Sequence, residues 1–191
     1  LACLRSGMVF LPLNTGYQSA ELRYFFNDAK PGLVVCDPSA LGWIAPLAKS
    51  SGCHHVETLG STISGSLLEK ATPFSDDFPT LACGPDALAA ILYTSGTTGR
   101  SKGAMLTHAN LASNALVLHH AWHWQESDVL IHALPIFHVH GLFVAIHGAL
   151  WAGAQMVWMS KFDAGAVAQE CARATVLMGV PTFYVRLVES G

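Results

Sequence analysis

The sequence predicts an α/β fold in which parallel β-sheets are flanked by helices. Short runs rich in β-branched and aromatic residues alternate with helical patterns along most of the chain. Some of these runs, such as LVVCD at 33–37, are apolar up to their last residue, which is typical of strands buried on both faces. In addition, 51% of the 191 residues are hydrophobic and only 12% are charged, so the chain can fill a good-sized core.

The alternation is regular over the first 59 residues. Residues 8–13 (MVFLPL) form the first predicted strand. A helix is expected over 19–29, with Ser19 as its N-cap and an apolar face made of Leu22, Phe25 and Phe26. Pro31 and Gly32 end this helix, and the pattern continues with a strand at 33–37, a weaker helix at 41–49 and a strand at 54–59.

Residues 60–86 differ in composition, because they are rich in Ser, Thr, Gly and Pro. They are expected to form a loop or linker with one short helix at 65–71, and they mark either a boundary between two subdomains or a surface excursion. The alternation then resumes with strands expected at 87–93, 128–135, 154–159 and 175–181. The expected helices are at 108–122 (capped by Thr107), 140–151 and 163–173.

A loop of small polar residues follows the predicted strand 87–93, with the sequence TSGTTGRSKG at 94–103. Its three glycines allow sharp turns and close backbone approach, while its hydroxyl groups and the amino group of Lys102 can donate hydrogen bonds to an anion. The loop is not a Walker A sequence, because Lys102 follows Ser101 and precedes Gly103. It is not a nucleophile elbow either, since Tyr93 stands where that motif needs glycine. A phosphate-binding loop and a polar surface turn both fit these residues.

Composition argues against several other classes of protein. The net charge is −3 with His neutral, and Lys and Arg do not cluster, which argues against nucleic acid as a partner. No apolar run is long enough to span a membrane. The ten histidines lack carboxylates or cysteines at ligand spacing, so a metal centre built on them is not expected. The five scattered cysteines are expected to be buried thiols, which favours the cytosol, with mitochondria as the alternative.

Four segments, in the same order along the chain, resemble the adenylate-forming superfamily of acyl- and aryl-CoA synthetases, adenylation domains and luciferases. These segments are SGMVFLPLNTGY (6–17) followed by KPGLVVCD (30–37), YTSGTTGRSKGAMLTHANL (93–111), LPIFHVHGL (134–142) and MGVPTFYVRL (178–187). Together with KFD at 161–163, they are most similar to malonyl-CoA synthetases. The resemblance implies that residues 1–191 are part of the large N-terminal domain of such an enzyme.

The resemblance also implies the role of the loop after the strand 87–93. It would hold the β- and γ-phosphates of ATP and orient the departing pyrophosphate, with the hydroxyl of Thr94 near Mg²⁺. The residues that match are Thr94, Ser95, Gly96, Thr97, Thr98, Gly99 and Lys102. Donors around the leaving phosphates stabilise the charge that grows there while the acid attacks the α-phosphorus.

Two residues further along the chain match the acyl side of the family's site. His138 stands where the superfamily has a gate residue between the acyl pocket and the thiol tunnel; a core histidine is the alternative. Gly141 is expected to permit close approach to the substrate. Arg186 matches the arginine that holds the distal carboxylate in malonyl-CoA synthetases; an exposed arginine on the last helix is the alternative. Arginine suits this role because its planar group binds a carboxylate by two hydrogen bonds.

The implied activity is that of an ATP-dependent acid–thiol ligase acting on malonate or methylmalonate, with CoA as co-substrate. Two alternatives remain open: a medium- or long-chain acyl-CoA synthetase or carrier-protein adenylation domain, and a truncated nucleotide-binding remnant without catalysis. The family's later motifs and its mobile C-terminal domain would lie beyond residue 191. The 191 residues alone are therefore expected to be inactive.

Overall fold

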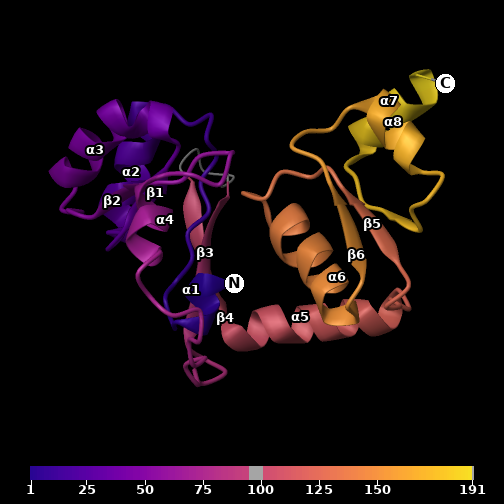
Figure 1. Ribbon diagram of the computed structural model, residues 1–191, viewed down its shortest axis with the longest axis horizontal. Coiled ribbons are helices and arrows are strands. Elements are labelled where there is room, and N and C mark those ends of the chain that lie inside the picture. Colours follow the sequence, from indigo (N-terminus) through magenta and orange to yellow (C-terminus); the bar gives the residue numbers. More distant parts are fainter. Residues whose placement is uncertain (95–100, 191) are drawn as a thin grey trace. The chain divides into compact units, whose positions relative to one another are not determined.

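The computed structural model describes residues 1–94 and 101–190 of the chain. These residues form two compact units. The larger unit comprises residues 1–13 and 81–191, and the smaller unit comprises residues 14–80. Figure 1 labels most of the helices and strands in both units.

The smaller unit is a two-stranded parallel sheet with helices. Its elements are α2 (Ser19–Ala29), β1 (Val34–Cys36), the 3₁₀-helix Pro38–Ala40, α3 (Leu41–Ser50), β2 (Val56–Thr58) and α4 (Ser66–Ala71). Strands β1 and β2 pair in parallel, as expected, with Val34 opposite Val56. The apolar face predicted for the first helix is confirmed, because Leu22, Phe25 and Phe26 are buried.

The N-cap expected at Ser19 is wrong by one residue. Gln18 is the N-cap, with an extended backbone, and Ser19 is the first helical residue. The backbone N–H of Gln18 donates to Oε2 of Glu21 at 2.8 Å, so the carboxylate three residues along accepts the N–H of the N-cap residue, as in a capping box.

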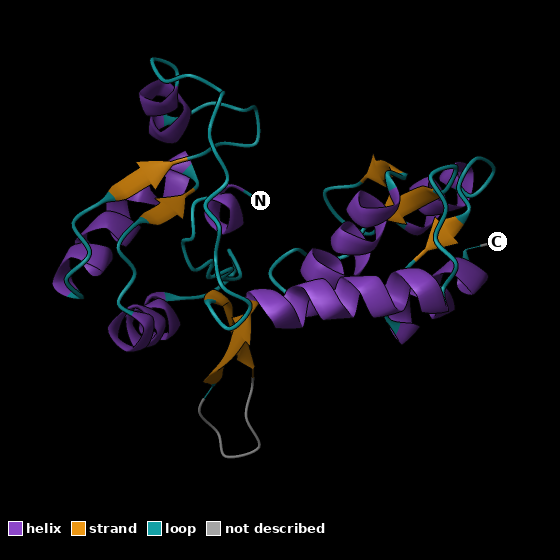
Figure 2. Cartoon of the chain, turned by 90° about the horizontal axis from the view of Figure 1, so that it is seen from below, coloured by secondary structure: helices purple, strands orange, loops and turns teal. Residues whose placement is uncertain are grey.

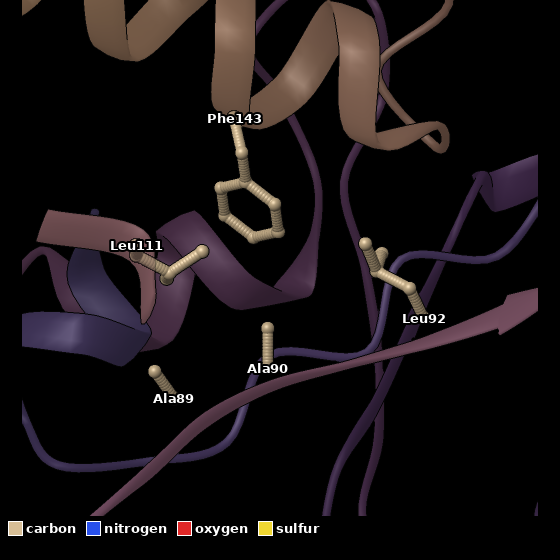
Figure 3. Close-up of a cluster of buried hydrophobic side chains, with 5 residues drawn as sticks. All are labelled: Ala89, Ala90, Leu92, Leu111 and Phe143. Carbon is tan, nitrogen blue, oxygen red and sulfur yellow. The ribbon is translucent and has the colours of Figure 1, made fainter. Parts of the chain in front are cut away.

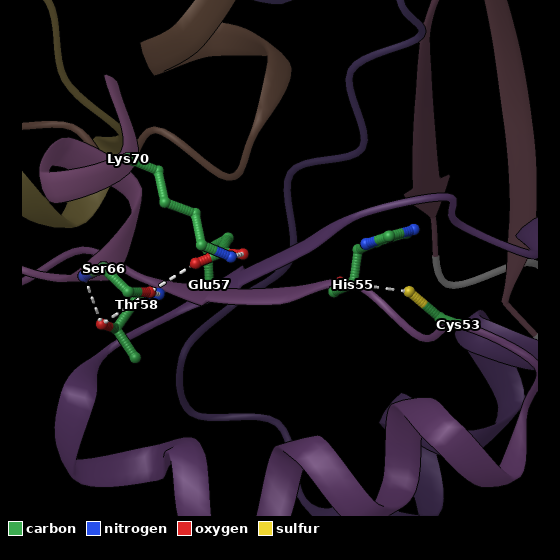
Figure 4. A network of polar contacts seen from close by, with 6 residues as sticks. All are labelled: Cys53, His55, Glu57, Thr58, Ser66 and Lys70. Carbon is green, nitrogen blue, oxygen red and sulfur yellow. Dashed lines mark hydrogen bonds and ion pairs between the residues drawn. The ribbon is translucent and has the colours of Figure 1, made fainter. Parts of the chain in front are cut away.

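A polar network ties α4 to β2 in the smaller unit (Figure 4). Glu57, which is only 8% exposed, pairs with the ammonium group of Lys70 and accepts a hydrogen bond from the Ser66 hydroxyl at 2.5 Å. The hydrogen bond from Lys70 lowers the pKa of Glu57 below its ordinary value, and the one from Ser66 adds to the effect. The backbone N–H of Thr58 donates to the Ser66 hydroxyl at 2.9 Å. Each buried polar group of this network therefore has a partner, as burial requires.

The larger unit contains an antiparallel hairpin and a parallel sheet. Its first elements are α1 (Ala2–Arg5), β3 (Leu88–Thr94), β4 (Lys102–Thr107) and α5 (His108–Ala121). The rest are β5 (Val129–His132), a π-helix (His140–Ala145), α6 (Ile146–Ala152), β6 (Gln155–Trp158), α7 (Ala164–Glu170), β7 (Val176–Leu177) and α8 (Pro181–Glu189). Thr107 caps α5 as expected, because its hydroxyl accepts from the N–H of Asn110 at 3.1 Å.

The parallel sheet has the strand order β6-β5-β7. His132 lies opposite Trp158 on β6, and Ile131 lies opposite Leu177 on β7. The parallel pairing predicted from the alternation of strands and helices is thus confirmed for these strands. Leu130 and Ile131 in the central strand have no exposed surface, as expected for a strand covered on both faces.

Two expected strands are wrong or too long. In place of a strand at 8–13, only Phe10 forms a bridge, in parallel with Ala90, and Pro12 has no N–H with which to continue a ladder. The strand expected at 175–181 is limited to β7, because Pro181 begins α8, where a proline suits the first helical turn.

The β3–β4 pair is antiparallel, unlike the other sheets. Figure 2 shows these two strands side by side, next to the start of α5. The helix expected at 140–151 begins as a π-helix and continues as α6.

The expectation that the cysteines are buried thiols holds only in part. Cys36 and Cys53 are buried, whereas Cys171 is exposed, because it lies in the turn that ends α7. All five cysteines are free. Among the residues that the structure describes, no helix is long and apolar enough to cross a membrane.

Candidate functional site

The hairpin β3–β4 brings together the first and last residues of the predicted phosphate loop. Thr94 ends β3, Lys102 begins β4, and the two face each other in the antiparallel register. Directly opposed residues of such a pair project to the same side of the sheet, so the Thr94 hydroxyl and the Lys102 side chain share one face. Both residues are exposed. The other predicted loop residues, Ser95, Gly96, Thr97, Thr98 and Gly99, lie outside the described residues.

Lys102 forms no ion pair within residues 1–94 and 101–190. Its positive charge is therefore not neutralised by a carboxylate of this part of the protein. An exposed lysine at the end of a hydroxyl-rich loop suits a phosphate as its partner.

The strand that carries this loop is anchored by a buried apolar cluster (Figure 3). Its members are Ala89, Ala90, Leu92, Leu111 and Phe143. Figure 3 shows the Phe143 ring extending from its helix toward Ala90 and Leu92 of β3. Because Phe143 belongs to the π-helix, the base of the hairpin packs directly on the helix that follows His138.

The loop that carries His138 begins at the carboxyl end of β5. His138 is exposed, and its ring lies 4.4 Å from that of Phe137 at a tilt of 55°. It is therefore not a core histidine. A ring at the surface can contact a bound molecule and can shift its rotamer, as the predicted gate requires.

The core histidine of this region is His132, at the end of β5. It is 1% exposed, and its ring stacks on Trp158 at 4.5 Å between centroids and 7° between planes. Its Nε2 donates to the carbonyl oxygen of Gly141 at 2.9 Å, which joins β5 to the π-helix. This hydrogen bond ties the two elements at either end of the loop from Ala133 to Val139, so His132 helps to fix that loop. π-helical turns such as this one are frequent at functional sites.

Gly141 permits a close approach by the protein itself. A Cβ atom added there would lie 2.4 Å from the Pro135 carbonyl oxygen and 3.1 Å from the Cβ of Leu134. The group that approaches Gly141 closely in this structure is thus the backbone of the His138 loop, where a substrate was expected. Any larger residue at this position would displace that loop.

Arg186 lies on α8, directly after β7. It is exposed, and its guanidinium carbon lies 5.0 Å from the centroid of the Phe162 ring. Phe162 in turn stacks on Phe183, with centroids 3.9 Å apart and planes 19° apart. Arg186 forms no ion pair with any carboxylate in the described part of the chain.

The residues predicted for the acyl side follow the strands of the β6-β5-β7 sheet. The loop with His138 follows β5, Phe162 follows β6, and α8 with Arg186 follows β7. The carboxyl ends of parallel strands lie at the same edge, where ligands of open α/β sheets bind. The structure therefore brings His138 and Arg186 to the edge at which an acid substrate is expected.

Sequence reasoning missed three residues of this region: His132, Phe162 and Phe183. His132 lies inside an apolar run, which gives no sign that its ring is hydrogen-bonded to a helix. Phe162 lies in the KFD segment, whose resemblance was noted without a role for the ring. No group of three or more His, Cys, Asp or Glu residues suited to a metal ion occurs in the part that the structure describes.

The AMP-binding enzyme family matches residues 1–191, which is the full length of the chain. The chain belongs to this family. AMP-binding enzymes of known structure include near neighbours of the fold: MatB from Rhodopseudomonas palustris, solved with ATP bound, matches at a TM-score of 0.95 and 56% identity, over 98% of this chain and 37% of that one. A malonyl-CoA ligase in a product complex with methylmalonyl-CoA and AMP matches at a TM-score of 0.77 and 31% identity, over 99% of this chain and 38% of that one.

Curated members of the AMP-binding family are also similar in sequence. The mitochondrial malonate–CoA ligase ACSF3 of Mus musculus is 38% identical over 190 residues, which are 96% of this chain and 32% of the relative. A feruloyl-CoA synthase from an Amycolatopsis species is 33% identical over 189 residues, which are 96% of this chain and 35% of the relative. The chain thus spans about a third of the length of these relatives.

Proposed function

We propose that this chain is part of an ATP-dependent acid–thiol ligase that acts on a small dicarboxylate, malonate or methylmalonate. The acid carboxylate attacks the α-phosphorus of ATP, which releases pyrophosphate and leaves an acyl-adenylate. The thiolate of CoA then attacks the acyl carbon and releases AMP, giving the thioester. The relatives named as malonate–CoA and malonyl-CoA ligases support this assignment.

The hairpin β3–β4 supplies the ATP side of the proposed site. Lys102 offers a mobile positive charge to the β- and γ-phosphates, and the residues between Thr94 and Lys102 supply further donors. Mg²⁺ suits this arrangement when it arrives with the nucleotide, because Mg²⁺ is commonly held by substrate phosphates and few protein ligands. The exposed hydroxyl of Thr94 is the oxygen that we propose for it. When bound, the ion neutralises phosphate charge.

His138 is proposed to face the acyl group and the incoming thiol. Its exposure and its position in the loop after β5 support a gate residue. Its neighbour Phe137 gives the imidazole an aromatic surface against which to rest.

The choice of acid rests on one observation, the state of the Arg186 side chain. It is exposed, its guanidinium carbon lies 5.0 Å from the Phe162 ring centroid, and it pairs with no carboxylate among the described residues. Family membership does not fix the acid, because relatives of comparable identity carry names for feruloyl and long-chain acids. A fixed cation is unfavourable beside an aliphatic tail and favourable beside a second carboxylate.

We further propose that the chain lies in the N-terminal domain of the full enzyme and that segment 60–86 joins two of its subdomains. The boundary between the two compact units at residues 80 and 81, which falls within this segment, supports the proposal, although residues 60–80 themselves belong to the smaller unit. Five free cysteines suit a reducing compartment, for which we propose the cytosol, although the mouse relative is named as mitochondrial. Small molecules, namely ATP, the dicarboxylate and CoA, are the proposed partners.

The test is Arg186→Ala in the full-length enzyme, assayed on malonate and on acetate. Loss of a charge-assisted contact costs about 1.5–3 kcal/mol, so kcat/KM for malonate should fall by about 10- to 150-fold while that for acetate changes little. Arg186→Lys should recover only part of the loss, because lysine lacks the two-pronged geometry. An equal fall for both acids would refute the dicarboxylate assignment.

A further inference from the structure

We propose that Phe162 is a positioning residue that holds the Arg186 guanidinium in place for the second carboxylate of the substrate and so contributes to the choice of a dicarboxylate. This inference rests on the proposed function. It assigns to an uncharged residue, outside the chemistry of the reaction, a part in substrate selection.

The geometry of the ring stack supports this role. The Arg186 guanidinium lies above the Phe162 ring at 5.0 Å, within the range of a cation–π contact. Phe183 stacks on Phe162 at 3.9 Å, so the platform is two rings deep. A stacked guanidinium keeps its N–H groups at the rim of its plane, where a carboxylate can accept two of them.

Phe162 is itself held firmly by the local sequence. It directly precedes Asp163, whose carboxylate accepts a hydrogen bond from the N–H of Ala166 at 2.9 Å and so caps α7. Phe162 also packs on the cluster that contains the fully buried Val167, four residues after the cap. A hydrophobic contact between these two positions fixes the angle at which the chain enters a helix. The ring therefore has a defined place before any substrate binds.

The charges around Arg186 leave its head group available. Glu189, three residues further along α8, makes no ion pair with it in the part of the chain that the structure describes. Glu170, on the neighbouring α7, is paired instead with Arg173. Without a carboxylate partner, a long flexible side chain would sample many rotamers, and the Phe162 ring restricts them. The entropy cost of ordering the Arg186 side chain when the substrate binds is therefore smaller.

The size of the expected effect follows from the strength of such contacts. Cation–π contacts range from weak at exposed sites to stronger when water is removed, which corresponds to about 3-fold to 30-fold in affinity. We expect Phe162→Leu to raise KM for malonate about 10-fold in the full-length enzyme. Because no reacting atom is touched, kcat for malonate and both constants for acetate should stay within about 2-fold of the parent.

Two further variants separate positioning from packing. Phe162→Tyr keeps the ring and should restore KM for malonate to within about 2-fold of the parent enzyme. Leu187→Ala is the matched control, because Leu187 packs on the same cluster from the same helix as Arg186. It should lower thermal stability at least as much as Phe162→Leu while leaving the malonate-to-acetate ratio unchanged.

The final arm is Phe162→Leu combined with Arg186→Ala. If Phe162 acts through Arg186, the double variant should be no worse on malonate than Arg186→Ala alone. The inference is overturned if Phe162→Leu and Leu187→Ala change the malonate-to-acetate ratio equally, if Phe162→Leu leaves that ratio unchanged, or if the double variant shows the two losses added together. Failure of the proposed function looks different, because Arg186→Ala by itself would then affect both acids alike.

Discussion

Glu57 in the smaller unit differs from Lys102 and Arg186 in the larger unit in how its charge is compensated. In the smaller unit, the nearly buried carboxylate of Glu57 is matched by Lys70 and Ser66. In the larger unit, Lys102 and Arg186 are exposed and have no carboxylate partner among the described residues. Arg186 lies instead on an aromatic ring.

This contrast is the one expected between a charge that maintains the fold and charges that, as proposed, bind a ligand. A buried carboxylate must be compensated within the protein, since an unpaired buried charge is strongly unfavourable. An exposed cation is solvated by water and loses little without a partner, so it remains available to an anion. Substitution of Glu57 should therefore change stability, whereas substitution of Lys102 or Arg186 should change activity.

The largest effect is expected for Lys102→Ala. If Lys102 stabilises the leaving phosphates as proposed, its loss should lower kcat for adenylate formation about 100-fold. The melting temperature should stay within about 1 °C of the parent value, because Lys102 is exposed and makes no described ion pair. On the full-length protein, pyrophosphate release measures the change in kcat, and thermal melting measures the change in stability. A large drop in melting temperature would show that Lys102 belongs with the fold-maintaining charges.

The next effect is expected in the smaller unit. Glu57→Ala removes the acceptor for Lys70 and Ser66 and should lower the free energy of unfolding, seen as a lower melting temperature. The malonate-to-acetate ratio should not change. Glu69→Ala on α4, the helix that carries Ser66 and Lys70, is the matched control, because Glu69 is exposed and should alter stability by less than about 0.5 kcal/mol. Equal stability of the two variants would contradict the role given to the network.

The smallest effect concerns His147, whose pKa is lowered below 6.5, mainly by burial. The unfolded chain then binds a proton more readily than the folded one, so stability falls as pH drops below about 6.5 and levels off above it. His147→Gln should reduce the loss of melting temperature between pH 7.5 and pH 5.5. The difference between parent and variant isolates His147 from the other histidines. An identical pH dependence in both proteins would show that His147 does not contribute.

Much of the fold could be predicted from the sequence, because periodicity and capping are local. The apolar face of the first helix and the Thr107 cap are confirmed, as are parallel strands at β1–β2 and β6-β5-β7. Strand lengths were overestimated where apolar runs continue beyond the paired residues, as at Pro12. The antiparallel β3–β4 pair was not predicted, because no strand was expected at 102–107; two consecutive strands joined by a short loop pair antiparallel.

The candidate site was predictable only where a motif carries it. Lys102, His138 and Arg186 stand in segments with a family resemblance, and their roles remain predictions. The partners of these residues depend on three-dimensional contacts between separate elements. The ring beneath Arg186 comes from a residue 24 positions earlier in the chain, and the bond from His132 to Gly141 crosses from a strand to a π-helix. Neither contact can be predicted from the residues adjacent to it in the sequence.

The Phe143 side chain connects the β3–β4 hairpin to the helix that follows the His138 loop. It lies in one cluster with Ala90 and Leu92 of β3, and it belongs to the π-helix directly after the loop that bears His138. Close-packed side chains transmit displacement because they leave no room to absorb it. The base of the β3–β4 hairpin therefore packs on the helix behind His138, and we expect a displacement of one to displace the other.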